Sequence, residues 1–92
     1  MLDHYSVAVG NTAPVLLATG TGGDAHTHVY LSNGTGADAY IGDYSVTTAD
    51  GYLLPKQQAT TISYRQEIDL AAGDTLWAIC SPTQTTTIQV IV

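Results

Sequence analysis

Apolar and polar residues alternate along most of the chain, which is the period of a β-strand with one buried face. The alternation is clearest over residues 4–9, 26–31, 59–64 and 87–92. A short apolar run at 15–18 follows a proline, and another apolar segment at 39–41 ends at a glycine. We expect a strand at each of these places. The residues at 65–71 are better explained as strand plus turn than as a helical turn.

One segment, residues 75–80, is apolar on both of its faces. That pattern predicts the central strand of a covered sheet. Trp77 shares a face with Thr75 and Ile79, and we expect its indole to pack in the core.

Turn signals separate these segments. Asn33-Gly34 is a strong hairpin signal, although Thr35 and Gly36 make the loop longer than two residues. Further turns are expected at 50–51 and 72–74, with a flexible connection at 20–24. Pro55 prevents the preceding two leucines from forming a central strand.

Seven or eight short strands with turns every 8–12 residues predict an all-β fold. We expect a single small β-sandwich or a jelly-roll-like barrel of antiparallel strands. Residues 1–92 form one domain in this interpretation, because the sequence has no internal repeat and no linker.

The composition narrows the range of partners. Charged residues make up 11% of the chain, less than half of the usual ~25%, and threonine occurs 14 times. The net charge is −6, with Lys56 and Arg65 as the two basic residues, so binding to nucleic acid or to anionic membranes is not expected. A surface with few charges suits permanent contact with copies of the chain or with another protein. The first dozen residues and the last strand are the segments expected to pair across subunits.

Sequence features also bear on where the protein is made. No stretch approaches 18 apolar residues, and the first residues lack a basic region followed by an apolar run, so neither a membrane span nor a signal peptide is expected. The single cysteine, Cys80, cannot form an internal disulfide, which favours folding in a reducing cytoplasm. Its place on an apolar strand indicates an inert, buried thiol.

His26 and His28 are the candidate metal ligands. Residues two apart on a strand share a face, and a threefold assembly would multiply the pair to six ligands around one ion. We favour the simpler interpretation, an ordinary polar strand face opposite Val29 and Leu31, so no metal site is expected and the metal site is kept as the alternative. Two acidic pairs, Glu67 with Asp69 and Asp43 with Asp50, are interpreted as solvated loop or edge residues.

No residue pattern predicts catalysis or a cofactor. The glycine-rich segment at 20–23 lacks the Gly-Lys-Ser/Thr ending and the helix of a phosphate-binding loop, and no serine lies in a nucleophile elbow. We therefore expect a protein that is not an enzyme. The tyrosines Tyr40, Tyr44, Tyr52 and Tyr64 are candidate surface aromatics, which would suit either a carbohydrate or a protein partner.

Several phrases of the sequence resemble small all-β virion proteins of tailed bacteriophages. They are Val29-Tyr30-Leu31-Ser32-Asn33, Ala39-Tyr40-Ile41-Gly42, Val46-Thr47 with Gly51, Leu54-Pro55, and Leu70-x-x-Gly73-Asp74-Thr75-Leu76-Trp77-Ala78-Ile79. The resemblance covers about residues 26–80. The chain departs from it at Gly42-Asp43-Tyr44, where a second glycine or a small polar residue is expected, so the resemblance implies nothing about the contacts of the 43–57 loop.

The resemblance implies a capsid decoration or minor head protein that binds the major capsid protein as a homotrimer. Such a protein would be assembled in the host cytoplasm and would lie on the capsid surface of the virion, where many bound copies stabilise the shell. The alternative is a tail or fibre-associated module that binds a receptor or a carbohydrate.

Overall fold

The computed structural model describes residues 4–21, 27–56 and 65–92, and these form eight β-strands. The strands are β1 (His4–Val9), β2 (Val15–Thr19), β3 (Thr27–Asn33), β4 (Ala39–Gly42), β5 (Tyr52–Leu54), β6 (Arg65–Leu70), β7 (Thr75–Cys80) and β8 (Thr86–Ile91). The all-β prediction is confirmed, and residues 65–70 are a strand. The alternating segment at 59–64 lies outside the described residues.

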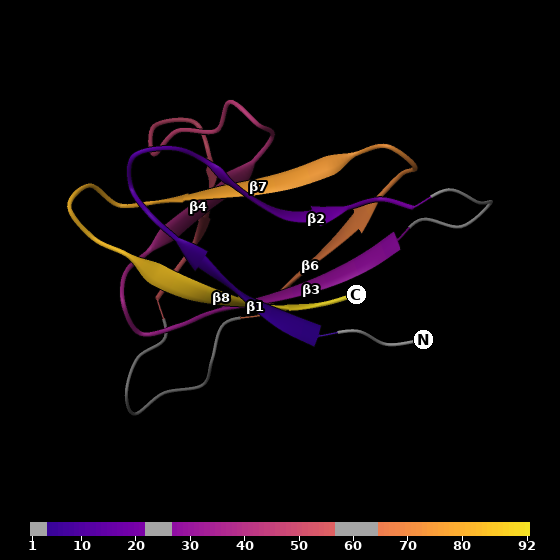
Figure 1. Ribbon diagram of the computed structural model, residues 1–92, viewed down its shortest axis with the longest axis horizontal. Coiled ribbons are helices and arrows are strands. Elements are labelled where there is room, and N and C mark those ends of the chain that lie inside the picture. Colours follow the sequence, from indigo (N-terminus) through magenta and orange to yellow (C-terminus); the bar gives the residue numbers. More distant parts are fainter. Residues whose placement is uncertain (1–3, 22–26, 57–64) are drawn as a thin grey trace.

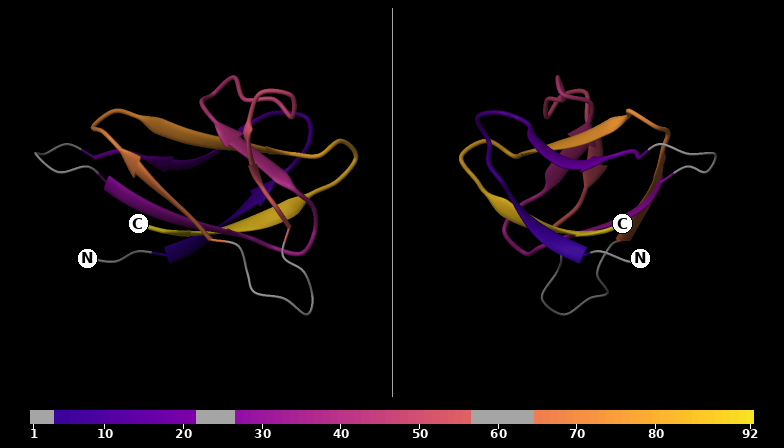
Figure 2. Two further views of the ribbon diagram at one scale, coloured as in Figure 1. Left: turned by 180° about the vertical axis from the view of Figure 1, so that it is seen from behind. Right: turned by 45° about the vertical axis from the view of Figure 1, so that its right-hand side comes forward.

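The strands form two four-stranded antiparallel sheets packed face to face (Figures 1 and 2). Sheet A has the order β1-β8-β3-β6, and sheet B has the order β2-β7-β4-β5. Every connection between successive strands passes from one sheet to the other, except for the one joining β4 to β5. This order is the jelly-roll topology, in an open sandwich rather than a closed barrel.

The core lies between the sheets and follows the alternation in the sequence. On β8, Ile88 and Val90 are fully buried while Thr87 and Gln89 are exposed, because successive side chains point to opposite faces. The other strands contribute in the same way. The largest fully buried side chains are Val9, Leu17, Val29, Leu31, Leu54, Cys80, Ile88 and Val90.

Strand β7 is an inner strand of sheet B, between β2 and β4, as its two apolar faces predicted. Its core-facing residues are Leu76, Ala78 and Cys80. The prediction that Trp77 packs in this core was wrong: its side chain lies on the opposite face of the sheet and is half-buried. Its indole Nε1 donates a hydrogen bond to Thr75 Oγ1 at 2.9 Å.

The hairpin expected at Asn33-Gly34 is a crossover, because β3 belongs to sheet A and β4 to sheet B. A two-residue hairpin turn of the Asn-Gly kind needs positive φ, and Gly34 does not have it. The glycine instead allows close approach, since a Cβ there would lie 2.9 Å from the carbonyl oxygen of Thr87. The backbone N–H of Gly34 donates to that same oxygen at 2.9 Å.

Asn33, at the end of β3, is the buried polar centre of this crossover. Its Nδ2 donates to the carbonyl oxygens of Ala37 at 2.8 Å and Leu54 at 2.9 Å, and its Oδ1 accepts from Thr86 Oγ1 at 2.7 Å. One amide thereby joins both sheets and the segment between them, with each of its hydrogen-bonding groups satisfied in a buried place.

Candidate protein-binding surface

The outer face of sheet B, which points away from the core, carries an unusual number of apolar side chains. In the register of the sheet, Leu16 lies opposite Trp77, and Tyr40 lies between Ile79 and Leu53. Directly opposed residues have Cβ atoms ~5 Å apart, and Trp77 and Ile79 share a face because they are two apart on β7. These five side chains therefore form one stripe of two adjoining rows across all four strands. We call it the sheet B stripe. Leu16 is 42% exposed and Leu53 is 46% exposed, whereas the other three are half-buried.

The loop between β4 and β5 rests on one part of this outer face (Figure 2). Val46 anchors it and is 4% exposed. Gly42 and Gly51 make room for it, because a Cβ would lie 3.0 Å from Val46 Cγ2 at the first and 2.8 Å at the second. The sheet therefore has a small apolar layer on its outside as well as the main core on its inside.

Two aspartates hold the shape of this loop. Asp43 Oδ1 accepts hydrogen bonds from the backbone N–H and the hydroxyl of Ser45, at 2.9 and 2.7 Å. Asp50 Oδ1 does the same for Thr47, at 2.8 Å each. These bonds stabilise the charged carboxylates, so the pKa of each lies below its ordinary value. Asp43 and Asp50 are exposed loop residues, as expected, and they position the loop.

The predicted surface tyrosines come together on this hairpin. Tyr44 lies in the loop and is 73% exposed, and Tyr52 begins β5 and is 61% exposed. Tyr40 belongs to the sheet B stripe. Tyr64 lies outside the described residues. Tyr52 lies opposite the buried Ile41, so it projects from the other face of sheet B than the stripe.

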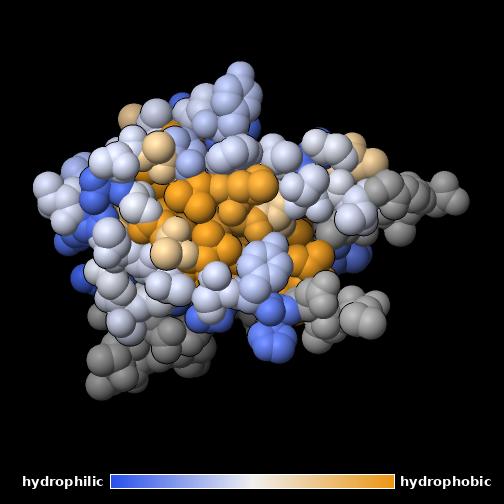
Figure 3. All heavy atoms as spheres, in the orientation of Figure 1, coloured by the Kyte–Doolittle hydropathy of each residue, from blue (hydrophilic) through white to orange (hydrophobic). Residues whose placement is uncertain are grey.

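A second apolar surface lies where the edge strands β1 and β2 meet. Figure 3 shows hydrophobic residues gathered between the two sheets on this side of the molecule. Figure 1 shows the same side as a ribbon. Val7 and Val15 are half-buried there. Tyr5 reaches across from β1, and its hydroxyl donates to the carbonyl oxygen of Leu17 on β2 at 2.6 Å. The sandwich is thus bridged by a tyrosine at this edge rather than closed by backbone pairing.

The four sheet edges differ in how well they are protected against pairing with another chain. Strand β5 has three residues and is followed by a proline, β2 has a register shift, and β6 carries acidic residues at 67 and 69. Such features discourage strand addition. Strand β1 has six residues in regular register, without proline, lysine or acidic residues. Strand β1 is an edge of sheet A, and pairing of the first dozen residues across subunits stays a prediction. The same prediction for the last strand was wrong, because β8 is an inner strand with a partner on each side.

The remaining site candidates lie away from these apolar surfaces. His28 lies exposed on the outer face of sheet A, opposite Asp69 of β6, and Glu67 is exposed on the same strand. His26 lies outside the described residues. Cys80 is buried, and burial raises the pKa of its thiol, as expected for an inert packing residue.

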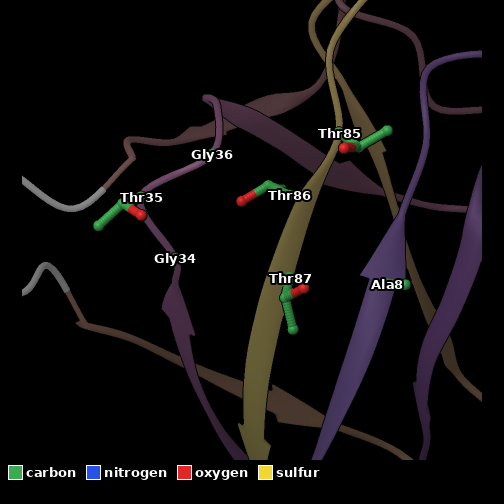
Figure 4. Close-up of a pocket in the computed structure, with 7 residues that line it drawn as sticks. All are labelled: Ala8, Gly34, Thr35, Gly36, Thr85, Thr86 and Thr87. Carbon is green, nitrogen blue, oxygen red and sulfur yellow. The ribbon is translucent and has the colours of Figure 1, made fainter.

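A cavity of about 390 Å³ lies beside the β3–β4 crossover (Figure 4). Its lining residues are Ala8, Gly34, Thr35, Gly36, Thr85, Thr86 and Thr87. None of these side chains ionises, so the cavity offers hydroxyl and backbone groups but no acid, base or metal ligand.

The structure therefore gathers apolar side chains on the outer face of sheet B and places His28, Glu67 and Asp69 together on the outer face of sheet A. The part of the chain that the structure describes has no helix long and apolar enough to cross a membrane. No protein-family model, curated protein or solved structure matches the chain.

Proposed function

We propose that the chain is a non-enzymatic structural protein that works through permanent contact with other protein subunits, as a capsid decoration protein of a tailed bacteriophage. The observation that carries the proposal is the sheet B stripe. Trp77, Tyr40, Ile79 and two exposed leucines share one sheet face without a charged side chain among them. Aromatic residues in an uncharged patch are the usual centre of a protein interface.

The low charge of the whole chain supports the same reading. A monomeric domain keeps ~25% charged residues, whereas this chain has 11%. The loop that rests on the outer face of sheet B leaves Leu16 and Leu53 exposed at the two edge strands. A partner that covered the stripe would remove both leucines from water at little cost in polar desolvation.

The identity of the partner rests on the resemblance to phage virion proteins. In this proposal the stripe contacts the major capsid protein on the outside of the shell, and the unprotected β1 edge contacts the neighbouring copy in a homotrimer. Jelly rolls occur among viral capsid domains and among lectins, which is an analogy at the level of the fold only. Assembly takes place in the host cytoplasm, and the net charge of −6 is consistent with a partner that is protein rather than DNA.

A second candidate is a tail or fibre-associated module that binds a carbohydrate or a receptor. Tyr44 and Tyr52 favour it, because both rings are more than half exposed on one hairpin. Sugar rings stack on exposed aromatic side chains of this kind, and tyrosine also supplies a hydroxyl for hydrogen bonding.

The test of the stripe is co-sedimentation of the purified chain with empty heads built from the major capsid protein of the same genome. We expect saturable binding by the wild type and at least a tenfold weaker binding by the double variant Leu16→Ser/Leu53→Ser. The matched control is Tyr30→Ser, which removes an exposed ring from the outer face of sheet A and should bind like the wild type. Absence of binding by the folded wild type would overturn the capsid assignment, and a positive glycan array would then favour the second candidate.

The test of the β1 edge is the native mass from sedimentation equilibrium. We expect a species three times the 9.6 kDa of one chain. Ala8→Lys on β1 should dissociate it, because a charge on an edge strand opposes pairing. Thr87→Lys is the matched control, since Thr87 lies directly opposite Ala8 on the inner strand β8 and is also exposed. A wild-type monomer at every concentration would exclude a preformed trimer.

A further inference from the structure

We propose that His28, Glu67 and Asp69 form a binding site for a first-row transition-metal ion, with Zn²⁺ as its best-fitting occupant. This inference is independent of the capsid proposal. His28 comes from β3, and both carboxylates come from the neighbouring edge strand β6. The three ligand atoms, one from each side chain, all lie within 4.8 Å of one another.

The register of the sheet explains why these groups meet. His28 lies directly opposite Asp69, and Glu67 lies two residues farther along β6, opposite Tyr30. Residues two apart on a strand share a face, so all three side chains project from the outer face of sheet A. His28 Nδ1 is 2.6 Å from Asp69 Oδ1 and 3.6 Å from Glu67 Oε1.

The charges of the group favour a cation. Two carboxylates carry a charge of −2, and a single imidazole can balance at most half of it. His28 is an ion-pair partner of both carboxylates. The whole chain has two lysine or arginine residues against eight acidic ones. A divalent ion would balance both charges at once.

The donor set selects the class of ion. Calcium and magnesium prefer all-oxygen ligands, whereas an imidazole nitrogen favours zinc and its first-row neighbours. Imidazole nitrogen and Asp or Glu oxygen are both zinc ligands, with bonds about 2.0–2.2 Å long. Tetrahedral ligands at such distances are about 3.4 Å apart, close to the 3.6 Å between His28 and Glu67. The contact between His28 Nδ1 and Asp69 Oδ1, which is 2.6 Å here, would lengthen by about 0.8 Å.

The site also has an entry path and an open position. The side chains of His28, Glu67 and Asp69 are 59%, 56% and 50% exposed. Three protein ligands leave the fourth tetrahedral position for water or for a donor from another molecule. Both strands belong to one sheet, so the backbone that carries the ligands is held by the ladder between β3 and β6.

The test is isothermal titration of the purified, folded chain with ZnCl₂, accompanied by thermal unfolding with and without the metal. We expect saturable binding of one Zn²⁺ per chain and a rise in Tm of about 5 °C at saturating metal. His28→Ala and Asp69→Asn should each weaken binding at least tenfold. His4→Ala is the matched control, because His4 is an exposed histidine on β1 of the same sheet, and it should bind like the wild type.

Three results would overturn the proposal. The first is absence of saturable Zn²⁺ binding by the wild type. The second is binding that survives in both His28→Ala and Asp69→Asn, which would place the ion elsewhere. The third is equal binding of Mg²⁺, which would indicate general attraction to an acidic surface. Circular dichroism of each variant ensures that a loss of binding is not a loss of folding.

Discussion

Replacing Asn33 by alanine should destabilise the fold far more than its small size suggests. The change removes three hydrogen bonds, to Ala37, Leu54 and Thr86, at a position that is 2% exposed. Two backbone carbonyls and one hydroxyl lose their partner in a buried place. Each such bond contributes about 1 kcal/mol net, and an unsatisfied buried group costs more, so the expected loss is about 3–4 kcal/mol in the free energy of unfolding.

That loss is large for a chain of this size. A domain of 92 residues has a stability of about 5–14 kcal/mol, so Asn33→Ala would remove roughly a fifth or more of it. The assay is urea unfolding followed by fluorescence of Trp77, the single tryptophan. The expected change is a lower midpoint at an unchanged slope.

Asn11→Ala is the matched control. Asn11 also donates from Nδ2 to a backbone carbonyl, that of Gln84 at 2.7 Å, but this bond is exposed to solvent. We expect it to cost less than about 1 kcal/mol, because water replaces the lost partner. Asn33→Asp separates the contributions further, since the carboxylate keeps the bond from Thr86 but cannot donate to the two carbonyls. Equal effects of Asn33→Ala and Asn11→Ala would refute the reasoning.

Three further predictions concern other parts of the fold. Gly36→Ala should lower the free energy of unfolding by about 2 kcal/mol, because the new Cβ would clash with the backbone of Thr85. Gly10→Ala is its control in the same unfolding assay and should be nearly neutral, since nothing lies within 4 Å of a Cβ placed there. Cys80 should resist alkylation by iodoacetamide in the native protein and react after unfolding; rapid native-state labelling would contradict its burial. The pKa of Asp43, followed by NMR, should lie below 3.8 and rise in Ser45→Ala. Since the pKa of Asp43 is lower in the folded chain than in the unfolded one, its charged form stabilises the loop above the unfolded pKa, and this stability is lost as the pH falls through the folded pKa. An unchanged Asp43 titration in Ser45→Ala would show that the Ser45 hydroxyl does not lower this pKa.

The strands could be predicted from the sequence because alternation is a local property. The apolar face of β8 and the two apolar faces of β7 identified both strands and the inner position of β7. The sheet to which each strand belongs depends on pairing between distant segments. Asn33-Gly34 illustrates this limit of local patterns. The same two residues suit a hairpin within one sheet or a crossover between two sheets, and only the placement of β4 decides which one forms.

The candidate surfaces were predictable to a lesser extent. Tyr40, Tyr44 and Tyr52 were recognised as surface aromatics, but the apolar pattern of β7 did not reveal which face pointed outward, so Trp77 was assigned to the core. Glu67 and Asp69 were correctly expected to be solvated. Their meeting with His28 follows from the register between β3 and β6, which no local pattern encodes.

The position of β8 between β1 and β3 has a consequence for how the chain folds during synthesis. Strands β1 and β3 have no pairing with each other, so sheet A cannot form until residues 86–91 have left the ribosome. The first strand made must wait for the last. Loop closure over such a separation is slow, and the unprotected β1 edge stays available to other nascent chains meanwhile. A cell that makes many copies at once would then gain from any early partner for β1.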